Sequence, residues 1–215
     1  MSEQMVLKIF EDVGAILKGG HFVYTSGKHG SVYVNKDAIY PFNRKTSFLG
    51  SLIAKNFFDD DIQTVIGPEK GAIILSQSVG YHLSQALFVD VFSVYAEKDG
   101  NGGFEIRRGY DRFVEEKNVL VVEDILNTGG SVKKTIKAVR KIGGNVVGVG
   151  CLWNRGGITS ESIDVPKLIS LTNLKFDAWN EKECPLCEKG IPISTEVGKG
   201  EEFLVRNAVL SRLGS

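Results

Sequence analysis

The sequence has few cysteines and no long apolar run, and each absence removes a class of protein. Its 215 residues include three cysteines, and this odd, scattered number does not make the disulfide framework of a small secreted domain. The longest apolar stretches fall far short of the roughly 20 residues of a membrane-spanning helix. The N-terminus, Met1-Ser2-Glu3-Gln4, lacks a positively charged leader followed by an apolar segment. We therefore expect a cytoplasmic protein with no membrane partner.

The sequence also has no excess of basic or of acidic residues. Lys plus Arg and Asp plus Glu both number 26, so composition gives no electrostatic footprint for nucleic acid, and none is expected as a partner. The P-loop pattern G-x-x-x-x-G-K-[ST] and the dinucleotide pattern G-x-G-x-x-G do not occur. The hydrophobic content of 42% is ordinary for one large domain with a sizeable core. Any anion site must therefore be local.

One stretch has the order expected of such a site. Val119 to Val122 read as a buried, parallel strand, two acids and a small-residue loop follow, and a helix is predicted over Val132–Ile142. In that loop, glycines permit close approach to a ligand, and Asn127, Thr128 and Ser131 can donate hydrogen bonds to phosphate with the first helical N–H groups. Glu123 and Asp124 would repel phosphate, so they suit sugar hydroxyls or a hydrated magnesium ion. An ordinary strand-turn-helix with an acidic turn explains Gly-Gly-Ser alone but not the whole order.

This stretch resembles the phosphoribosyl pyrophosphate (PRPP) motif of the type I phosphoribosyltransferases. The resemblance implies that the 5′-phosphate binds the loop and that the acids bind the ribose hydroxyls, with Asp124 also catalytic. The residues expected to bind PRPP here are Glu123, Asp124, Ile125, Leu126, Asn127, Thr128, Gly129, Gly130 and Ser131.

The N-terminal segment carries a second resemblance. After a helix predicted from Met5 to Leu17 and stopped by Gly19-Gly20, strands at residues 22–25 and 31–35 form a hairpin with a basic tip. A solvated turn would explain the basic tip by itself. The run from Thr25 to Pro41, however, resembles the orotate phosphoribosyltransferases, and this implies that Lys28, Tyr33 and Val34 bind orotate.

A second glycine loop follows a short strand. A helix is predicted from Arg44 to Phe58, with Asn43 as its cap, and the strand at residues 64–67 leads into Gly67-Pro68-Glu69-Lys70-Gly71. Lys70 can neutralise pyrophosphate there, although a surface lysine in a tight turn is the plain alternative. The family resemblance implies a PRPP contact for Lys70, while Glu69 replaces an aromatic residue found in some relatives.

The polar, glycine-rich run from Glu97 to Gly103 suits a mobile lid. Resemblance implies that it closes over PRPP with Lys98 as a catalytic cation, across a homodimer. Other cations expected in this loop are absent, and Arg107 and Arg108 are candidates to replace them. Surface pairs with Glu115 or Glu116 are the alternative.

Two further sites lie toward the C-terminus. Arg155 follows a strand predicted over Asn145–Trp153. Its planar fork can bind a carboxylate, and its resemblance to the family's orotate-binding arginine implies that role. A plain strand-end arginine is the alternative. A cysteine pair with the spacing of half a zinc knuckle occurs in Cys184-Pro185-Leu186-Cys187. A structural zinc needs four ligands, and Cys151 is the one other cysteine, so a fourth sulfur ligand is missing. We therefore interpret the segment as structural.

Alternating strands and helices from 44 to 153 predict an α/β fold, a mostly parallel sheet with helices on both faces and ligands at the strand carboxyl ends. We expect a single phosphoribosyltransferase domain over 1–215, with a core at about 44–171 and a hood from 1–43 and part of 172–215. The resemblance implies transfer of ribose 5-phosphate from PRPP to orotate, giving orotidine 5′-monophosphate and pyrophosphate. Mg²⁺ is expected as cofactor, held mainly through PRPP with no direct protein ligand. A phosphoribosyltransferase for another base and a non-catalytic PRPP-binding regulator stay open as alternatives.

Overall fold

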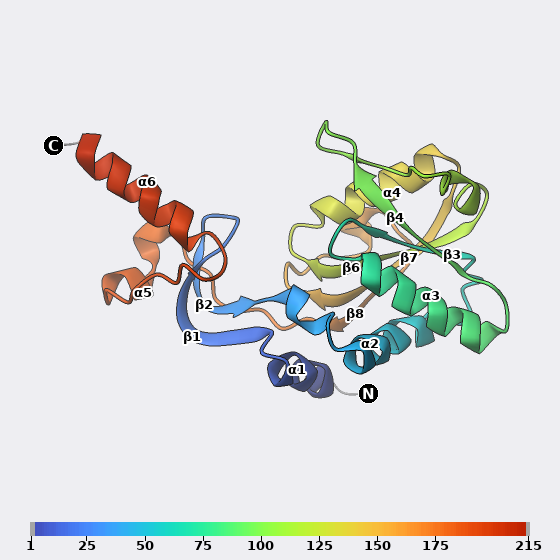
Figure 1. Ribbon diagram of the computed structural model, residues 1–215, viewed down its shortest axis with the longest axis horizontal. Helices are drawn as coiled ribbons and strands as arrows, with labels where there is room; N and C mark the ends of the chain where they lie inside the picture. Colours follow the sequence, from blue (N-terminus) through green and yellow to red (C-terminus); the bar gives the residue numbers. More distant parts are fainter. Residues whose placement is uncertain (1–2, 214–215) are drawn as a thin grey trace. The chain divides into compact units, whose positions relative to one another are not determined.

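The computed structural model describes residues 3–213, and these form two compact units (Figure 1). The first unit comprises residues up to Ile9 together with 36–174, and the second comprises residues 10–35 and those from Lys175 onward. Within residues 3–213, no helix is long and apolar enough to cross a membrane. The predictions of a single domain and of a hood stay predictions.

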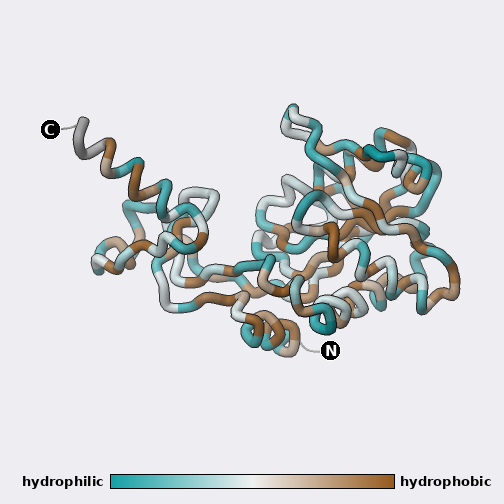
Figure 2. The backbone as a smooth tube through the Cα atoms, viewed as in Figure 1, coloured by the Kyte–Doolittle hydropathy of each residue, from teal (hydrophilic) through white to brown (hydrophobic). Residues whose placement is uncertain are grey.

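The first unit is built on a six-stranded sheet with the order β5-β4-β3-β6-β7-β8. Neighbouring strands run parallel except for the short edge strand β5, which pairs antiparallel with β4. Hydrophobic residues follow the strands of this sheet (Figure 2), and all five residues of β3 are buried. The strand bounds are β3 Thr64–Pro68, β4 Phe92–Lys98, β5 Phe104–Glu105, β6 Asn118–Leu126, β7 Asn145–Asn154 and β8 Leu168–Thr172.

Helices α2 (Asn43–Lys55) and α3 (Ile73–Leu87) cover one face of the sheet, and α4 (Gly130–Lys141) covers the other (Figure 1). Strand β7 shows why both faces are buried. A side chain at Gly150 would collide with Ile53 of α2, 2.5 Å away, so that helix lies directly on the backbone. The next residue, Cys151, belongs to a buried cluster with Val132 and other residues of α4. The predicted doubly covered, mostly parallel sheet is therefore confirmed.

The order of the strands creates a crevice at one edge of this sheet. From β3 the chain passes through α3 to β4, and it then returns to the other side of β3 to form β6. Because β3 and β6 are parallel neighbours, the loops that follow them meet at the same edge. Ligands of open α/β sheets bind at such a switch point.

Two predicted helix ends were wrong. The first helix, α1, spans Glu3–Asp12 rather than reaching Leu17, because Gly14 takes a φ of +69° and its N–H donates to the Glu11 carbonyl at 2.9 Å. Helix α2 begins at Asn43 itself and ends at Lys55, so Asn43 is its first residue and not its cap.

The second unit combines a hairpin with the C-terminal segment. Strands β1 (Ile16–Val23) and β2 (His29–Val34) pair antiparallel, which confirms the predicted hairpin with longer strands. His29 also exchanges two backbone hydrogen bonds with Trp179, each 2.8 Å long. The helices of this unit are α5 (Pro185–Glu188) and α6 (Gly200–Leu213), and the 3₁₀ helices of the chain are η1 Lys36–Ile39, η2 Asp111–Phe113, η3 Glu161–Ile163 and η4 Glu181–Glu183.

Candidate functional site

A cavity of about 470 Å³ lies at the carboxyl ends of β3, β4 and β6 in the first unit. Three lysines and three acids line it, together with residues of the β3–α3 turn and the start of α4. The lining residues are Lys36, Asp37, Pro68, Glu69, Lys70, Gly71, Lys98, Glu123 and Ser131. The sheet edge thus gathers several of the residues that the sequence analysis selected separately, and its mixed charge suits a ligand with both phosphate and hydroxyl groups.

The two acids of β6 are buried at this edge. Asp124 is 2% exposed, and its Oδ2 lies 2.6 Å from Nζ of Lys36. The other oxygen, Oδ1, accepts a hydrogen bond of 2.6 Å from the N–H of Ile125. Glu123 is 6% exposed and accepts a hydrogen bond from the N–H of Asp124 at 3.2 Å. Asp124 is therefore a positioned carboxylate balanced by one lysine.

Burial and charge shift the protonation of these groups. Burial, and then the neighbouring charge of Asp124, raise the pKa of Glu123 to about 8. Partial burial acts to lower the pKa of Lys36, but attraction to Asp124, Asp37 and Glu123 raises it overall. The pKa of Tyr40 is raised by burial and by the same acids. The pocket thus favours the protonated form of Glu123 beside the Lys36–Asp124 ion pair.

The loop between β6 and α4 presents small polar groups. Asn127, Thr128 and Ser131 are exposed, and Gly129 enters the helix with a φ of +72°, a conformation that favours glycine. Ile125 is half-buried, whereas Leu126 packs its side chain into the core at 1% exposure. A ligand contact by Leu126 would therefore come from its backbone.

Two glycines allow loops to approach each other closely. A side chain at Gly71 would meet Oδ2 of Asp124 at 2.2 Å and Nζ of Lys36 at 2.5 Å. The N–H of Gly156 donates to the Leu126 carbonyl at 2.9 Å, and a side chain there would meet the Asn127 carbonyl oxygen. Both positions fix the width of the site.

Glu69 ties the turn that carries Lys70 to the end of the strand that carries Lys98. Its carboxylate accepts a 2.9 Å hydrogen bond from the backbone N–H of Lys98, and its own N–H donates to the Ala96 carbonyl at 2.9 Å. The turn after β3 is thereby tied to the end of β4. Lys70 and Lys98 both have exposed side chains that line the cavity, so each ammonium is accessible to an anion.

The glycine-rich run forms the tip of the β4–β5 hairpin. Oδ1 of Asp99 accepts hydrogen bonds of 2.8 Å from the N–H groups of Asn101 and Gly103. Arg108 pairs with Glu97 through two hydrogen bonds of 2.9 and 2.7 Å, and Arg107 pairs with Glu105. The surface-pair alternative for both arginines is therefore observed, but with partners other than the predicted Glu115 and Glu116.

The residues predicted to bind orotate are divided between the units. Arg155 is half-buried directly after β7 in the first unit. Lys28, Tyr33 and Val34 belong to the second unit, where Lys28 is exposed at the hairpin tip and Val34 is buried at 8% exposure. Their roles toward orotate stay predictions.

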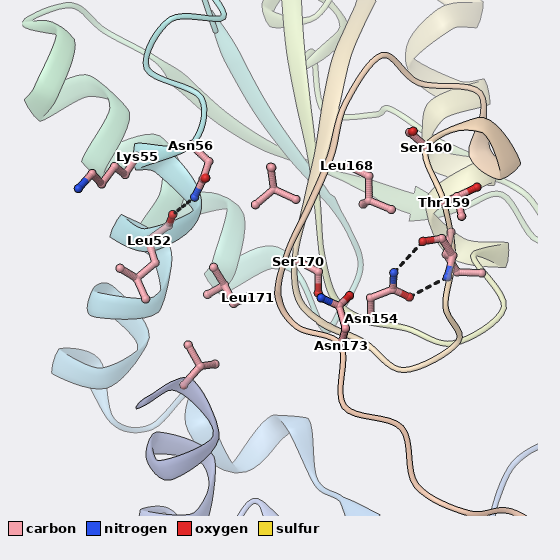
Figure 3. A pocket seen from close by; sticks show the side chains of 13 residues that line it. Leu52, Lys55, Asn56, Asn154, Thr159, Ser160, Leu168, Ser170, Leu171 and Asn173 are labelled. Atoms are coloured by element: carbon pink, nitrogen blue, oxygen red, sulfur yellow. Dashed lines mark hydrogen bonds between the residues drawn. The ribbon is translucent and has the colours of Figure 1, made fainter. Parts of the chain in front are cut away.

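A larger cavity, of about 940 Å³, lies elsewhere in the first unit beside β8 and α2 (Figure 3). Aliphatic side chains such as Leu52 and Leu168 line it, and Asn154 braces the neighbouring loop by two hydrogen bonds to Ile158, of 2.7 and 2.9 Å. Lys55 is its one charged lining residue. Because catalytic chemistry needs convergent polar groups, the smaller cavity is the better candidate.

Sequence reasoning missed three residues of the site. Lys36 pairs with Asp124, Glu69 holds the Lys98 backbone, and Oη of Tyr40 is buried with no hydrogen-bond partner in the described chain. Lys36 and Tyr40 lie within the run from Thr25 to Pro41 that carries the family resemblance, so that run held the available signal. The pairing itself joins positions 88 residues apart, which no local pattern reveals.

Comparison with known proteins identifies the family. Residues 44–186 match the phosphoribosyl transferase domain. The chain is 38% identical over 193 residues to an orotate phosphoribosyltransferase of Thermoanaerobacter sp. (strain X514), covering 90% of this chain and 96% of that protein. It is 37% identical over 197 residues to the enzyme of Thermotoga maritima, covering 91% and 99%.

The fold is also shared with solved structures. One is the Mycobacterium tuberculosis H37Rv orotate phosphoribosyltransferase in complex with 5-phospho-α-D-ribosyl 1-diphosphate, with a TM-score of 0.59 and 21% identity over 79% of this chain and 94% of that one. The domain match and the two sequence relatives show that the chain belongs to the orotate phosphoribosyltransferase family, within the phosphoribosyl transferases.

Proposed function

We propose that this protein transfers ribose 5-phosphate from PRPP to a ring nitrogen of orotate, giving orotidine 5′-monophosphate and pyrophosphate for pyrimidine nucleotide synthesis. The observation that carries the proposal is the single cavity that joins Lys70, Lys98, Glu123 and Ser131 at the switch point of the sheet. The named activity of the sequence relatives supports the substrate pair.

The loop after β6 and the acids before it bind the two ends of the sugar phosphate. Thr128, Ser131 and the first N–H groups of α4 donate to the 5′-phosphate, which also lies at the positive end of a 12-residue helix. Glu123 and Asp124 accept hydrogen bonds from the ribose hydroxyls. Positive charge develops on the sugar as the C1′–O bond breaks, and the negative charge of Asp124 stabilises it.

The lysines act on the leaving group. The bond between C1′ and the pyrophosphate oxygen breaks, and its electron pair stays on pyrophosphate. The orotate nitrogen forms the new bond to C1′ and releases its N–H proton to the departing pyrophosphate or to solvent. Lys70 binds the pyrophosphate, and Lys98 neutralises the charge that grows on it. Because Lys98 is at the end of β4 and next to the glycine-rich tip, closure of that tip would bring its ammonium to the leaving group and exclude water.

Orotate carries a carboxylate and ring carbonyls, so its site needs cations and hydrogen-bond donors. Arg155 supplies a planar fork for the carboxylate. Lys28, Tyr33 and the backbone of Val34 complete the base site in this proposal, in keeping with the family resemblance of their segment.

Magnesium enters with PRPP and not on a protein site of its own. Both oxygens of Asp124 already have partners, in Lys36 Nζ and the Ile125 N–H, and Glu123 is buried with a raised pKa. These residues fit an ion that is held by diphosphate oxygens and reaches the protein through water. When bound, Mg²⁺ neutralises charge on the departing pyrophosphate.

We also infer a cytoplasmic homodimer in which each glycine-rich tip closes on the neighbouring subunit's site. Ile74 and Tyr81 of α3 are 49% and 54% exposed and give that helix an apolar surface suited to association. Sedimentation of the purified protein tests the dimer, and a monomer at all concentrations would contradict it.

The decisive experiment follows the ultraviolet absorbance of orotate with PRPP and Mg²⁺ present together and each omitted in turn. We expect loss of orotate absorbance only with all three components. Turnover of another base in a parallel panel, with orotate inert, would reassign the substrate. Tight PRPP binding without pyrophosphate release from any base would show a binding protein instead.

A further inference from the structure

A cluster of metal-ligand side chains lies in the second unit, and it includes none of the acids or lysines that line the cavity of the first. It consists of His21 and His29 from the hairpin and Cys184 and Cys187 from the C-terminal segment, and their ligand atoms all lie within 4.8 Å of one another. His21, His29 and Cys184 are 1%, 0% and 3% exposed. Two of the chain's three histidines and two of its three cysteines therefore meet at one buried point.

The distances match the edges of a metal-centred tetrahedron. Nε2 of His21 lies 2.9 Å from Nδ1 of His29, and Sγ of Cys187 lies 3.7 Å and 3.2 Å from these two nitrogens. Sγ of Cys184 lies 3.7 Å from Nε2 of His21. Zinc with bonds of about 2.0–2.1 Å to nitrogen and 2.3 Å to sulfur requires ligand separations of roughly 3.3–3.8 Å. No separation among the four ligand atoms exceeds 4.8 Å, so shifts of up to about 1 Å bring them into that arrangement.

Hydrogen bonds outside the cluster orient the histidines toward its centre. Nδ1 of His21 lies 2.7 Å from the Ile191 carbonyl oxygen. Because a carbonyl oxygen only accepts hydrogen bonds, Nδ1 carries the proton, and Nε2 presents its lone pair to the cluster. The backbone of His29 is fixed by its two hydrogen bonds with Trp179.

The cysteine pair has the local geometry of a metal-binding turn. Cys184 precedes the single turn of α5, and the N–H of Gly190 donates to the Cys187 carbonyl at 3.0 Å. Gly190 has a φ of +64°, which allows the chain to reverse directly after the second sulfur. Both thiols are free of disulfide bonds, and the histidine nitrogens lie 3.2–3.7 Å from them.

We propose that His21, His29, Cys184 and Cys187 bind a zinc ion with a structural role. Two nitrogens and two sulfurs in tetrahedral reach favour zinc over magnesium or calcium, which prefer oxygen. Four protein ligands leave no open position for water or substrate, so the ion is not a catalytic one.

The position of the cluster explains what the ion would do. It joins the β1–β2 hairpin to residues 158 positions later in the sequence, inside a unit made only of residues 10–35 and those from Lys175 onward. Units below roughly 70–80 residues rarely gain enough stability from an apolar core alone and commonly use a metal. The zinc is thus a cross-link between the two chain segments of this unit.

The test is the metal content of the purified full chain, measured by mass spectrometry without added metal. We expect about one zinc per chain in the wild type, and loss of most of it in Cys187→Ser and His21→Gln. Cys151→Ala and His82→Gln are the matched controls, because Cys151 lies in β7 and His82 lies 2.9 Å from Ser47 Oγ in the first unit, and both should keep the zinc.

A measurement on the wild-type chain covers the case in which the variants do not fold. Chain stripped of metal by a chelator and reloaded with Co²⁺ should show the strong visible bands of tetrahedral cobalt and a thiolate-to-cobalt band in the near ultraviolet. A wild type that neither carries zinc nor gives this spectrum would overturn the proposal. So would iron in place of zinc, or an isolated Cys184–Cys187 disulfide. None of these measurements depends on enzyme activity.

Discussion

The two units use polar side chains in opposite ways. In the first unit, lysines and acids line an open cavity at the ends of neighbouring strands, where a charged ligand can enter and leave. In the second, imidazoles and thiols converge with little exposure, which suits an ion that stays. The difference teaches that charged side chains around an open cavity indicate a substrate site, whereas four buried imidazole and thiol groups around one point indicate a structural metal site. Each prediction below tests one side of that contrast.

The largest effect is expected on turnover from Asp124→Asn. Loss of the carboxylate removes its stabilisation of the cationic sugar, and kcat should fall by roughly 10²–10³-fold while the protein stays folded. Steady-state kinetics and circular dichroism measure both. Asp164→Asn is the matched control. Asp164 also forms an ion pair, of 2.6 Å with Arg140, but its side chain is exposed and lies outside the cavity. Equal rates in the two variants would contradict the assigned role.

Metal removal should affect stability instead. Structural zinc commonly contributes several kcal/mol to folding, so a chelator should lower the unfolding midpoint by roughly 10 °C, at about 2–4 °C per kcal/mol. Thermal scans with and without chelator measure this. Cys187→Ser should start at the lower midpoint and show no further shift. An equal shift in wild type and variant would mean that the chelator acts elsewhere.

Buried Glu123 should make the stability of the folded protein fall as pH rises. The folded pKa of Glu123, about 8, lies above its ordinary value of 4.5, so the folded chain holds a proton that the unfolded chain has released. This contribution is complete below about pH 4.5 and is lost as pH rises through about 8. Glu123→Gln should therefore flatten the decline between these pH values by up to roughly 5 kcal/mol.

Urea denaturation at several pH values measures that change. Glu115→Gln is the control, because Glu115 is exposed and should leave the pH profile unaltered. If Glu123→Gln and wild type lose stability in parallel, Glu123 is ionised in the folded protein and does not shape the profile.

The smallest effect is expected from Lys98→Ala. Its ammonium is exposed before substrate binds and acts most strongly as charge develops on pyrophosphate, so kcat should fall by roughly tenfold with a smaller rise in KM. Lys141→Ala, at the far end of α4, should change neither constant. A rise in KM alone would make Lys98 a binding residue only.

Prediction from sequence succeeded where the information was local. Strand β6, its loop and α4 follow one another without interruption, so hydrophobic pattern and loop chemistry placed Glu123 and Ser131 at a strand end. Prediction failed where the pattern was ambiguous. Ile16 and Leu17 continue the helical spacing of the apolar residues in α1, but the helix has already ended before Gly14.

Contacts over long sequence distances were not predictable. Lys36 meets Asp124 only because η1 and β6 pack together in the fold. The zinc ligands were missed for the same reason. The spacing of the cysteine pair predicts no complete set of four sulfur ligands, and the two remaining ligands, His21 and His29, lie some 160 positions earlier in the sequence. Sequence spacing cannot reveal ligands that tertiary structure alone brings together.

The hydrogen-bonded link between His29 and Trp179 has a consequence for how the chain is made. The hairpin is synthesised well before its partner residues in the second unit, which include Trp179. At about 5–20 residues per second, the hairpin waits roughly 8–30 s for them. During that interval its apolar side is uncovered, so a nascent chain stalled before Trp179 is a natural client for chaperones.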